Sequence, residues 1–207
     1  MTTLTINTAS SETSIALFDK NRLISEKTWP GKNDEAEKLM PAIESLLKNS
    51  KKTYKDLEKI IVVKGPGSFT GLRIGVTVAN IIACLEKCRL FAVDSFEYWW
   101  TAGPEKAALL IFAGSGGVYV GLKPFDIPKL VKINDINQYL EENNVNNIFG
   151  DISEEQKNII NAKFIPIKQS FGKIMKNIVA KNLNPVKIVK PYYIKKPGIT
   201  KSKKKII

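Results

Sequence analysis

The chain has 207 residues, 43% of them hydrophobic, which is enough to bury a core in one large domain or two small lobes. It carries a formal net charge of +12, no histidine and two cysteines, and two thiols alone cannot complete a four-ligand structural zinc site. No run reaches the roughly 18 apolar residues of a membrane span, and the first residues lack the pattern of a secretory leader. We therefore expect a cytoplasmic protein without a metal site or a membrane partner.

The first three elements along the chain are expected to be strands. Short apolar runs at 4–8, 14–19 and 23–29 are separated by turn-forming residues. This spacing predicts an antiparallel meander of three consecutive strands.

A helix is expected next. Asp34 and Glu37 have the spacing of an N-cap and its capping-box partner. The apolar positions that follow share one helical face: Ala36, Leu39, Met40, Ile43, Leu46 and Leu47. Pro41 lies inside this pattern, so we expect it to kink the helix or to reset its start.

A strand, a glycine-rich loop and a second helix follow. The β-branched run 59–63 predicts the strand, 65–71 forms the loop, and 72–87 has helical periodicity. A short strand at 91–93 and a helix at 95–100 complete the first half of the chain.

The second half repeats this alternation with weaker signals. Apolar runs at 107–112 and 118–122 flank a glycine-rich turn and predict a hairpin. The elements expected after it are a helix at 136–142, a strand at 147–149, a helix from 154, a strand at 164–167 and a helix at 171–183. Strands followed by crossover helices, twice over, predict an α/β fold of two related lobes, although no sequence repeat proves a duplication. The expected limits are 1–104 for the N-terminal lobe, 105–194 for the C-terminal lobe and 195–207 for a basic tail.

The positive charge is concentrated in the last quarter of the chain. After Glu155 there are 14 lysines and no acidic residue, whereas the preceding part has 18 basic and 20 acidic residues. Lysines near the end are candidates for sequence-independent contact with RNA phosphates: Lys201, Lys203, Lys204 and Lys205. The alternative is a compositional bias toward lysine, because only three of the 32 basic residues are arginine.

The loop 65–71 is the most specific feature of the sequence. Its glycines permit tight turns and close backbone approach, and the helix that follows offers unpaired N–H groups to an anion. Candidate ligand-binding residues are Thr8, Ser10, Gly67 and Ser68. The alternative is that Ser68 or Thr70 only caps the helix. A phosphate-binding lysine loop is not matched, because Leu72 and Arg73 stand where lysine and a hydroxyl residue are required.

The helix after the loop carries a stripe of small residues. Gly71, Gly75, Ala79 and Ala83 recur at intervals of four, so another backbone can approach along this face. Packing against the sheet of the same lobe and docking of a partner helix both fit this pattern.

The string Gly-Pro-Gly-Ser-Phe-Thr-Gly-Leu-Arg-Ile-Gly at 65–75 resembles the TsaB family, also called YeaZ. Three further segments are similar to that family: Ile6-Asn7-Thr8-Ala9-Ser10, Leu39-Met40-Pro41 and Pro191-Tyr192-Tyr193-Ile194. The resemblance covers the first hundred residues well and the second lobe loosely.

This resemblance implies a two-lobed fold like that of actin and the heat-shock ATPases (ASKHA), with a reduced second lobe. It also implies a non-catalytic partner that activates TsaD, which transfers a threonylcarbamoyl group to the adenosine beside the anticodon of tRNA. The ATPase TsaE completes the machinery, tRNA is bound through the complex, and any ATP and magnesium belong to that complex. Alone, the chain is expected to form a homodimer.

Carried over by position, two helices of the chain would contact TsaD. The interface residues implied are Leu39, Ile43, Leu47, Thr70, Arg73, Gly75 and Ala79.

The missing histidines argue against catalysis by the chain itself. TsaD-type enzymes hold a metal through histidines after the strand where this chain has Asp94 and Glu97, and carboxylates three apart more often cap a helix or face solvent. The imidazole that usually serves as base for a serine or cysteine nucleophile is also absent. We therefore assign no catalytic residue.

Two departures from the TsaB pattern bear on nucleotide binding. Asn7 replaces an aspartate, and Phe112 begins a segment where relatives have Asp-Ala-Arg, so binding by this chain is not expected. Two other functions stay open: a glycoprotease-like or ATP-hydrolysing enzyme of the same superfamily, and a stand-alone RNA-binding protein that depends on the lysine tail.

Overall fold

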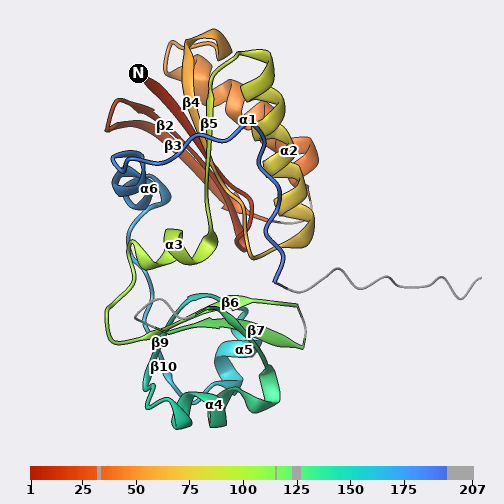
Figure 1. The fold of residues 1–207 in the computed structure, drawn as a ribbon, viewed down its shortest axis with the longest axis vertical. Coiled ribbons are helices and arrows are strands. Elements are labelled where there is room, and N and C mark those ends of the chain that lie inside the picture. The colour runs from red at the N-terminus through yellow and green to blue at the C-terminus, as the bar shows by residue number, and fades with distance from the viewer. Residues whose placement is uncertain (32–33, 115, 123–126, 195–207) are drawn as a thin grey trace, which may run out of the picture.

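The computed structural model describes residues 1–31, 34–114, 116–122 and 127–194. Two lobes lie end to end, and each is built on one five-stranded sheet with helices against it (Figure 1). In the described residues, no helix is both long and apolar enough to cross a membrane.

The first sheet begins with the predicted meander. Strands β1 (Thr2–Asn7), β2 (Glu12–Asp19) and β3 (Arg22–Pro30) pair antiparallel in sequence. Strands β4 (Leu57–Val63) and β5 (Arg89–Val93) then add in parallel on the other side of β1. The resulting strand order is β3-β2-β1-β4-β5.

Helices cover both faces of this sheet. Helices α1 (Glu35–Asn49) and α2 (Phe69–Leu85) pack on one face, and α6 (Phe171–Val179) packs on the opposite face (Figure 1). Neighbouring side chains of β4 point to opposite faces of the sheet. Val62 packs in the cluster with α1 and α2, whereas Ile61 packs in the cluster with α6. Burial on both faces explains the unbroken apolar run of β4.

Helix α1 differs from its expected start. The capping box predicted for Asp34 and Glu37 does not form; the Asp34 carboxylate instead pairs with the Lys38 ammonium at 2.5 Å. Pro41 does not reset the helix, which runs from Glu35 to Asn49. A one-turn ion pair at i, i+4 therefore takes the aspartate away from the N-cap role.

The second sheet contains the predicted hairpin of β6 (Ala108–Phe112) and β7 (Gly117–Gly121). Strands β8 (Lys129–Lys132), β9 (Asn147–Asp151) and β10 (Lys163–Phe164) complete it in the order β10-β9-β6-β7-β8. If the strands of each lobe are numbered one to five along the chain, both sheets have the order 3-2-1-4-5. In both, the first three strands pair antiparallel and the last two add in parallel. The duplication that the sequence did not prove is therefore present in the topology.

Helices of the second lobe and the connecting helix complete the elements. Helices α4 (Ile136–Glu142) and α5 (Glu154–Ile159) follow β8 and β9, and α3 (Ser95–Trp100) links the lobes. Short 3-10 turns occupy Tyr54–Asp56 and Ile133–Asp135.

Aromatic side chains fix α3 between the two sheets. Trp100 meets Phe149 of β9 edge to face, with ring centroids 4.9 Å apart, while Tyr98 lies 5.9 Å from Phe171 of α6. Adjacent aromatics on this short helix thus anchor it to both lobes, which is a packing role rather than a base-stacking one.

The C-terminal part of the chain does not stay in the second lobe, so the expected limits of 105–194 do not describe one unit. Helix α6 packs on β2 and β3, and Val186 bridges to Leu90 of β5. Its apolar face is needed there because the first sheet would otherwise expose the face that carries Phe18.

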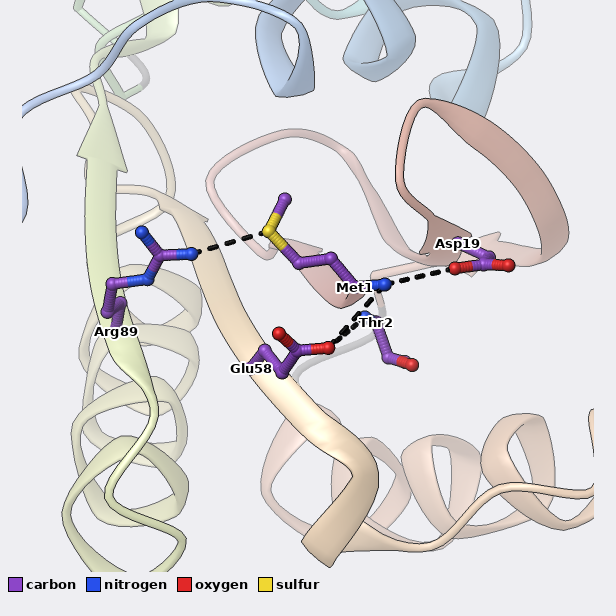
Figure 2. Close-up of polar contacts among 5 residues, drawn as sticks. All are labelled: Met1, Thr2, Asp19, Glu58 and Arg89. Atoms are coloured by element: carbon purple, nitrogen blue, oxygen red, sulfur yellow. Dashed lines mark hydrogen bonds and ion pairs between the residues drawn. The ribbon is translucent and has the colours of Figure 1, made fainter.

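Polar contacts hold the start of β1 between its neighbours, as Figure 2 shows. The Met1 ammonium lies 3.1 Å from Asp19 Oδ1 and 3.5 Å from Glu58 Oε1, and Arg89 donates to the Met1 sulfur at 3.3 Å. The ammonium hydrogen bond holds the pKa of the Asp19 carboxyl below its usual value.

Candidate functional site

A cleft of about 620 Å³ lies between the lobes, where the glycine loop faces the second sheet. Its walls come from the β1–β2 turn, the starts of α1 and α2, the β6–β7 hairpin, the end of β9 and the C-terminal segment. The residues that line it include Ser10, Ser11, Gly31, Glu35, Gly67, Ser68, Phe69, Thr70, Phe112, Tyr119, Asp151, Ser153 and Tyr193.

The loop glycines are required by contact with the β1–β2 turn. A Cβ on Gly67 would stand 2.0 Å from the Ala9 carbonyl oxygen, and one on Gly71 would stand 2.1 Å from the Thr8 carbonyl oxygen. The backbone N–H of Ser68 also donates to the Ala9 carbonyl at 2.8 Å. The glycines therefore let two backbones pack together, which is a structural use of the motif.

Ser68 caps helix α2, as one of the two interpretations of the motif predicted. Its hydroxyl accepts the backbone N–H of Gly71 at 3.2 Å. Thr70 is exposed at the first turn and lines the cleft.

The four candidate ligand-binding residues separate into two groups. Ser10, Gly67 and Ser68 line the cleft, whereas Thr8 is buried and its hydroxyl donates to the Gly71 carbonyl at 2.7 Å. Thr8 thus fastens the segment that follows β1 to α2, and it is not among the residues that line the cleft.

Asn7 shapes the turn beside the cleft. Its side-chain carbonyl accepts the Ala9 N–H at 2.9 Å, and its amide donates to the Ser10 hydroxyl at 3.0 Å. The buried Tyr98 hydroxyl also hydrogen-bonds Asn7, and burial raises the pKa of Tyr98. Asparagine is therefore part of a local hydrogen-bond network, and its amide supplies a donor that an ionised aspartate would lack.

Two acidic side chains face the cleft, one from each lobe. Asp151 accepts from the Ser11 backbone N–H at 2.7 Å and from the Ser11 hydroxyl at 2.5 Å. Burial raises the pKa of the Asp151 carboxyl despite these hydrogen bonds. Glu35, on the first turn of α1, is buried, and its Oε2 atom has no hydrogen-bond partner.

This set of side chains does not fit the polyphosphate of ATP with magnesium. The described lining residues include no lysine or arginine, and a phosphate would meet Glu35 and Asp151. In the described part of the chain, no three Asp, Glu or Cys side chains gather as metal ligands. We derive no nucleotide chemistry from this cleft.

The C-terminal segment closes one side of the cleft against α2. Tyr193 packs on Phe69 with ring centroids 5.1 Å apart, and the Arg73 guanidinium lies 3.9 Å above the Phe69 ring. Arg73 Nε donates to the Tyr193 hydroxyl at 3.4 Å. The segment is fastened further along by Asn80, which exchanges two hydrogen bonds of 2.9 Å with the backbone of Val189.

The predicted interface residues also separate into two groups. Five of them are buried in the first lobe: Leu39, Ile43, Leu47, Gly75 and Ala79. Thr70 and Arg73 are exposed. The stripe of small residues faces the sheet, because a Cβ on Gly75 would stand 2.1 Å from the Thr8 hydroxyl. In the chain by itself, these five residues are enclosed within the lobe and are not part of its exposed surface.

An exposed apolar surface on α2 was missed by the sequence analysis. Ile81 is 50% exposed and Leu85 is 72% exposed, and the half-buried Ile74 and Val78 precede them on the same side of the helix. The spacing of four, three and four residues was visible in the sequence, but the glycine motif drew attention to the opposite face. We call Ile74, Val78, Ile81 and Leu85 the α2 outer face.

The carboxylates after β5 and the tail lysines were also singled out in the sequence. Asp94 caps α3 by accepting the Glu97 N–H at 2.8 Å, and Glu97 pairs with Lys181 at 3.0 Å, as expected for carboxylates in structural roles. The four tail lysines 201 and 203–205 lie outside the described residues.

Comparison with known proteins identifies the family. A family model described as TsaD, tRNA N6-adenosine threonylcarbamoyltransferase, matches residues 31–138, just over half of the chain. The chain belongs to this family.

Relatives and solved structures place it with TsaB. The tRNA threonylcarbamoyladenosine biosynthesis protein TsaB of Bacillus subtilis (strain 168) is 40% identical over 125 residues, which cover 59% of this chain and 55% of that protein. TsaB of Buchnera aphidicola subsp. Schizaphis graminum is 29% identical over 123 residues, covering 57% and 58%. The chain thus spans little more than half the length of these two relatives.

The fold of a solved relative extends over almost the whole chain. YeaZ from Pseudomonas aeruginosa superposes with a TM-score of 0.72 at 18% identity, covering 93% of this chain and 99% of that one. The predicted resemblance to TsaB (YeaZ) and the predicted two-lobed α/β fold are confirmed.

Proposed function

We propose that this TsaB-like protein takes part in forming threonylcarbamoyladenosine in tRNA, as a non-catalytic partner that binds and activates TsaD. The similarity to TsaB proteins and the match to the TsaD family support the role in this pathway. The observation that carries the partner role is the α2 outer face.

This surface has the chemistry of a helix-docking site. Leu85 and Ile81 leave half or more of their surface in water, although burying such a side chain is worth about 1.5–3 kcal/mol. Their spacing along α2 matches the ridges that pack between two helices. The exposed Arg73 and Thr70 add polar groups near the start of the same helix, and Thr70 also lines the cleft.

The C-terminal segment adds to this surface. Hydrogen bonds between Asn80 and Val189 hold the segment along α2, and the adjacent Ile188 is 62% exposed. A partner helix on α2 would therefore also contact Ile188, in addition to the α2 outer face.

The side chains of the cleft support the absence of catalysis by this chain alone. The sequence has no histidine, Ser11 is engaged by Asp151, and Asp94 is used as a helix cap. In this proposal, ATP, magnesium and TsaE act in the assembled complex, tRNA is bound through that complex, and the whole operates in the cytoplasm.

Binding to TsaD tests the proposal directly. Full-length chain and TsaD of the same organism are mixed, and complex formation and threonylcarbamoylation of cognate tRNA are measured. Leu85→Lys should weaken binding by about tenfold or more, because a lysine charge would be buried in an apolar contact. Leu130→Lys is the matched control, since Leu130 is 44% exposed on β8 of the second lobe.

Other results would contradict the proposal. TsaD binding by Leu85→Lys at wild-type affinity would remove the assigned surface. Robust cleavage of ATP or peptides by the purified chain alone would favour the enzyme of the same superfamily. Salt-sensitive tRNA binding that depends only on residues 195–207 would favour the stand-alone RNA-binding protein.

A further inference from the structure

The cleft between the lobes has a charge opposite to that of the protein. The chain carries a formal net charge of +12, yet the described residues that line the cleft include two acidic side chains and no basic one. Such a local reversal favours cationic ligands over anionic ones.

Glu35 makes this reversal specific. The residue is only 5% exposed, and its Oε2 atom is buried without a hydrogen-bond partner. A buried polar group without a partner is costly and is rare in native proteins. Asp151 differs, because both of its carboxyl oxygens accept hydrogen bonds from Ser11.

Glu35 packs against Gly31 at the wall of the cleft. A Cβ on Gly31 would come within 2.8 Å of Glu35 Oε1, so a larger residue would crowd this carboxylate. No hydrogen bond from the first turn of α1 reaches the carboxylate, so the helix does not use it as a cap. Glu35 is itself one of the residues that line the cleft, so a cationic donor bound there would lie beside its carboxylate.

The remaining walls suit an organic ammonium ion rather than a bare metal ion. Aromatic rings of Phe112, Tyr119 and Tyr193 line the cleft, and aromatic faces attract ammonium groups. Phe69 also lines it, but Arg73 already occupies one face of that ring. A volume of about 620 Å³ is typical of small-molecule sites. Hydroxyl groups of Ser10 and Thr70 add polar contacts.

We propose that the cleft between the lobes binds a primary amine, with Glu35 as the counter-ion of the ammonium group and the aromatic walls around its carbon chain. This site is separate from the α2 outer face, and it does not depend on the proposed role in tRNA modification. It adds a small-molecule or side-chain ligand to the protein.

Two sources can supply the same ammonium chemistry. One is a free amine in solution. The other is the chain itself, because Tyr193 lines the cleft and the lysine-rich residues 195–207 follow it in sequence.

Calorimetric titration with putrescine tests the proposal, with 1,4-butanediol as the neutral ligand of the same carbon chain. The full-length protein, Glu35→Gln and Glu37→Gln are compared. Glu37 lies on the same helical turn but is exposed, so its substitution removes the same charge away from the cleft. A fourth variant changes the lysines of 195–207 to glutamine and is titrated with and without Glu35→Gln.

We expect putrescine to bind and butanediol not to bind. Glu35→Gln should weaken binding about tenfold or more, and Glu37→Gln should leave it unchanged. A further outcome is that putrescine binds only after the tail lysines are replaced, and that this binding is lost again with Glu35→Gln. That result would show that the ammonium group comes from the chain's own lysines in the wild type. Equal affinity of wild type and Glu35→Gln, or no putrescine binding in any of the variants, would overturn the proposal. Thermal unfolding confirms that each variant is folded.

Discussion

Ser11 and Asp151 join the two lobes through two hydrogen bonds, although 140 positions separate them in sequence. Ser11 belongs to the β1–β2 turn and Asp151 ends β9, so the pair sets the distance between the sheets at the cleft. Both acceptors are oxygens of one carboxylate, so a substitution of Asp151 removes both hydrogen bonds, whereas Ser11→Ala removes only the one from the hydroxyl.

The pair predicts a pH dependence of stability. Burial raises the pKa of Asp151 above its unfolded value near 3.8, so the folded protein binds this proton more tightly than the unfolded chain does. The resulting stability is fully present below the unfolded pKa and is lost as the pH rises through the folded pKa. The Asp151→Asn side chain cannot ionise, so this variant does not lose that stability. Its free energy of unfolding should therefore increase relative to that of wild type as the pH rises above 3.8. Urea unfolding at several pH values measures this difference, and parallel curves would refute the prediction.

Substitution of Gly75 should destabilise the first lobe. Gly75→Ala would place a Cβ 2.1 Å from the Thr8 hydroxyl oxygen, so β1 and α2 must move apart. We expect a loss of about 1–3 kcal/mol in the free energy of unfolding, typical of overpacking. Gly116→Ala is the control, because nothing lies within 4 Å of the added Cβ. Equal stability of the two variants would show that the contact relaxes freely.

Ala79→Leu and Leu85→Lys should separate folding from partner binding. Ala79 is fully buried against the sheet, so Ala79→Leu should lower the free energy of unfolding by about 1–3 kcal/mol. Leu85 is 72% exposed, so Leu85→Lys should leave the melting temperature within a few degrees of wild type. Calorimetry measures both. A stable Ala79→Leu variant would show that this helix face has unfilled space.

Asn80→Ala should release the C-terminal segment. The substitution removes both hydrogen bonds to the Val189 backbone and leaves a half-buried N–H and C=O without partners, at a cost of about 1–3 kcal/mol. Amide hydrogen exchange in residues 186–193 should then accelerate, while exchange in β4 should change little. Asn143→Ala is the control, since its amide bonds only the Tyr139 carbonyl within the end of α4. Unchanged exchange at 186–193 would mean that other contacts hold the segment.

Local patterns in the sequence predicted most elements correctly, because their causes lie within a few residues. Apolar alternation placed the meander, and the expected helices at 95–100 and 136–142 match α3 and α4. Strand β8 was missed, since Lys129–Lys132 buries only Val131 and exposes the rest. The capping box failed because Lys38 competes for Asp34, and a residue pattern does not rank such alternatives.

The glycine motif shows the limit of sequence more clearly. The sequence by itself determined that Gly67, Gly71 and Gly75 need close backbone approach, and with it the family and the α/β fold. Only the tertiary structure decided that the approaching groups are Thr8 and Ala9 of the same lobe. Only it placed α6 on the first sheet and brought Glu35 and Asp151 to one cleft. These contacts join residues that are distant in sequence, and their free energy depends on how whole sheets and helices pack together.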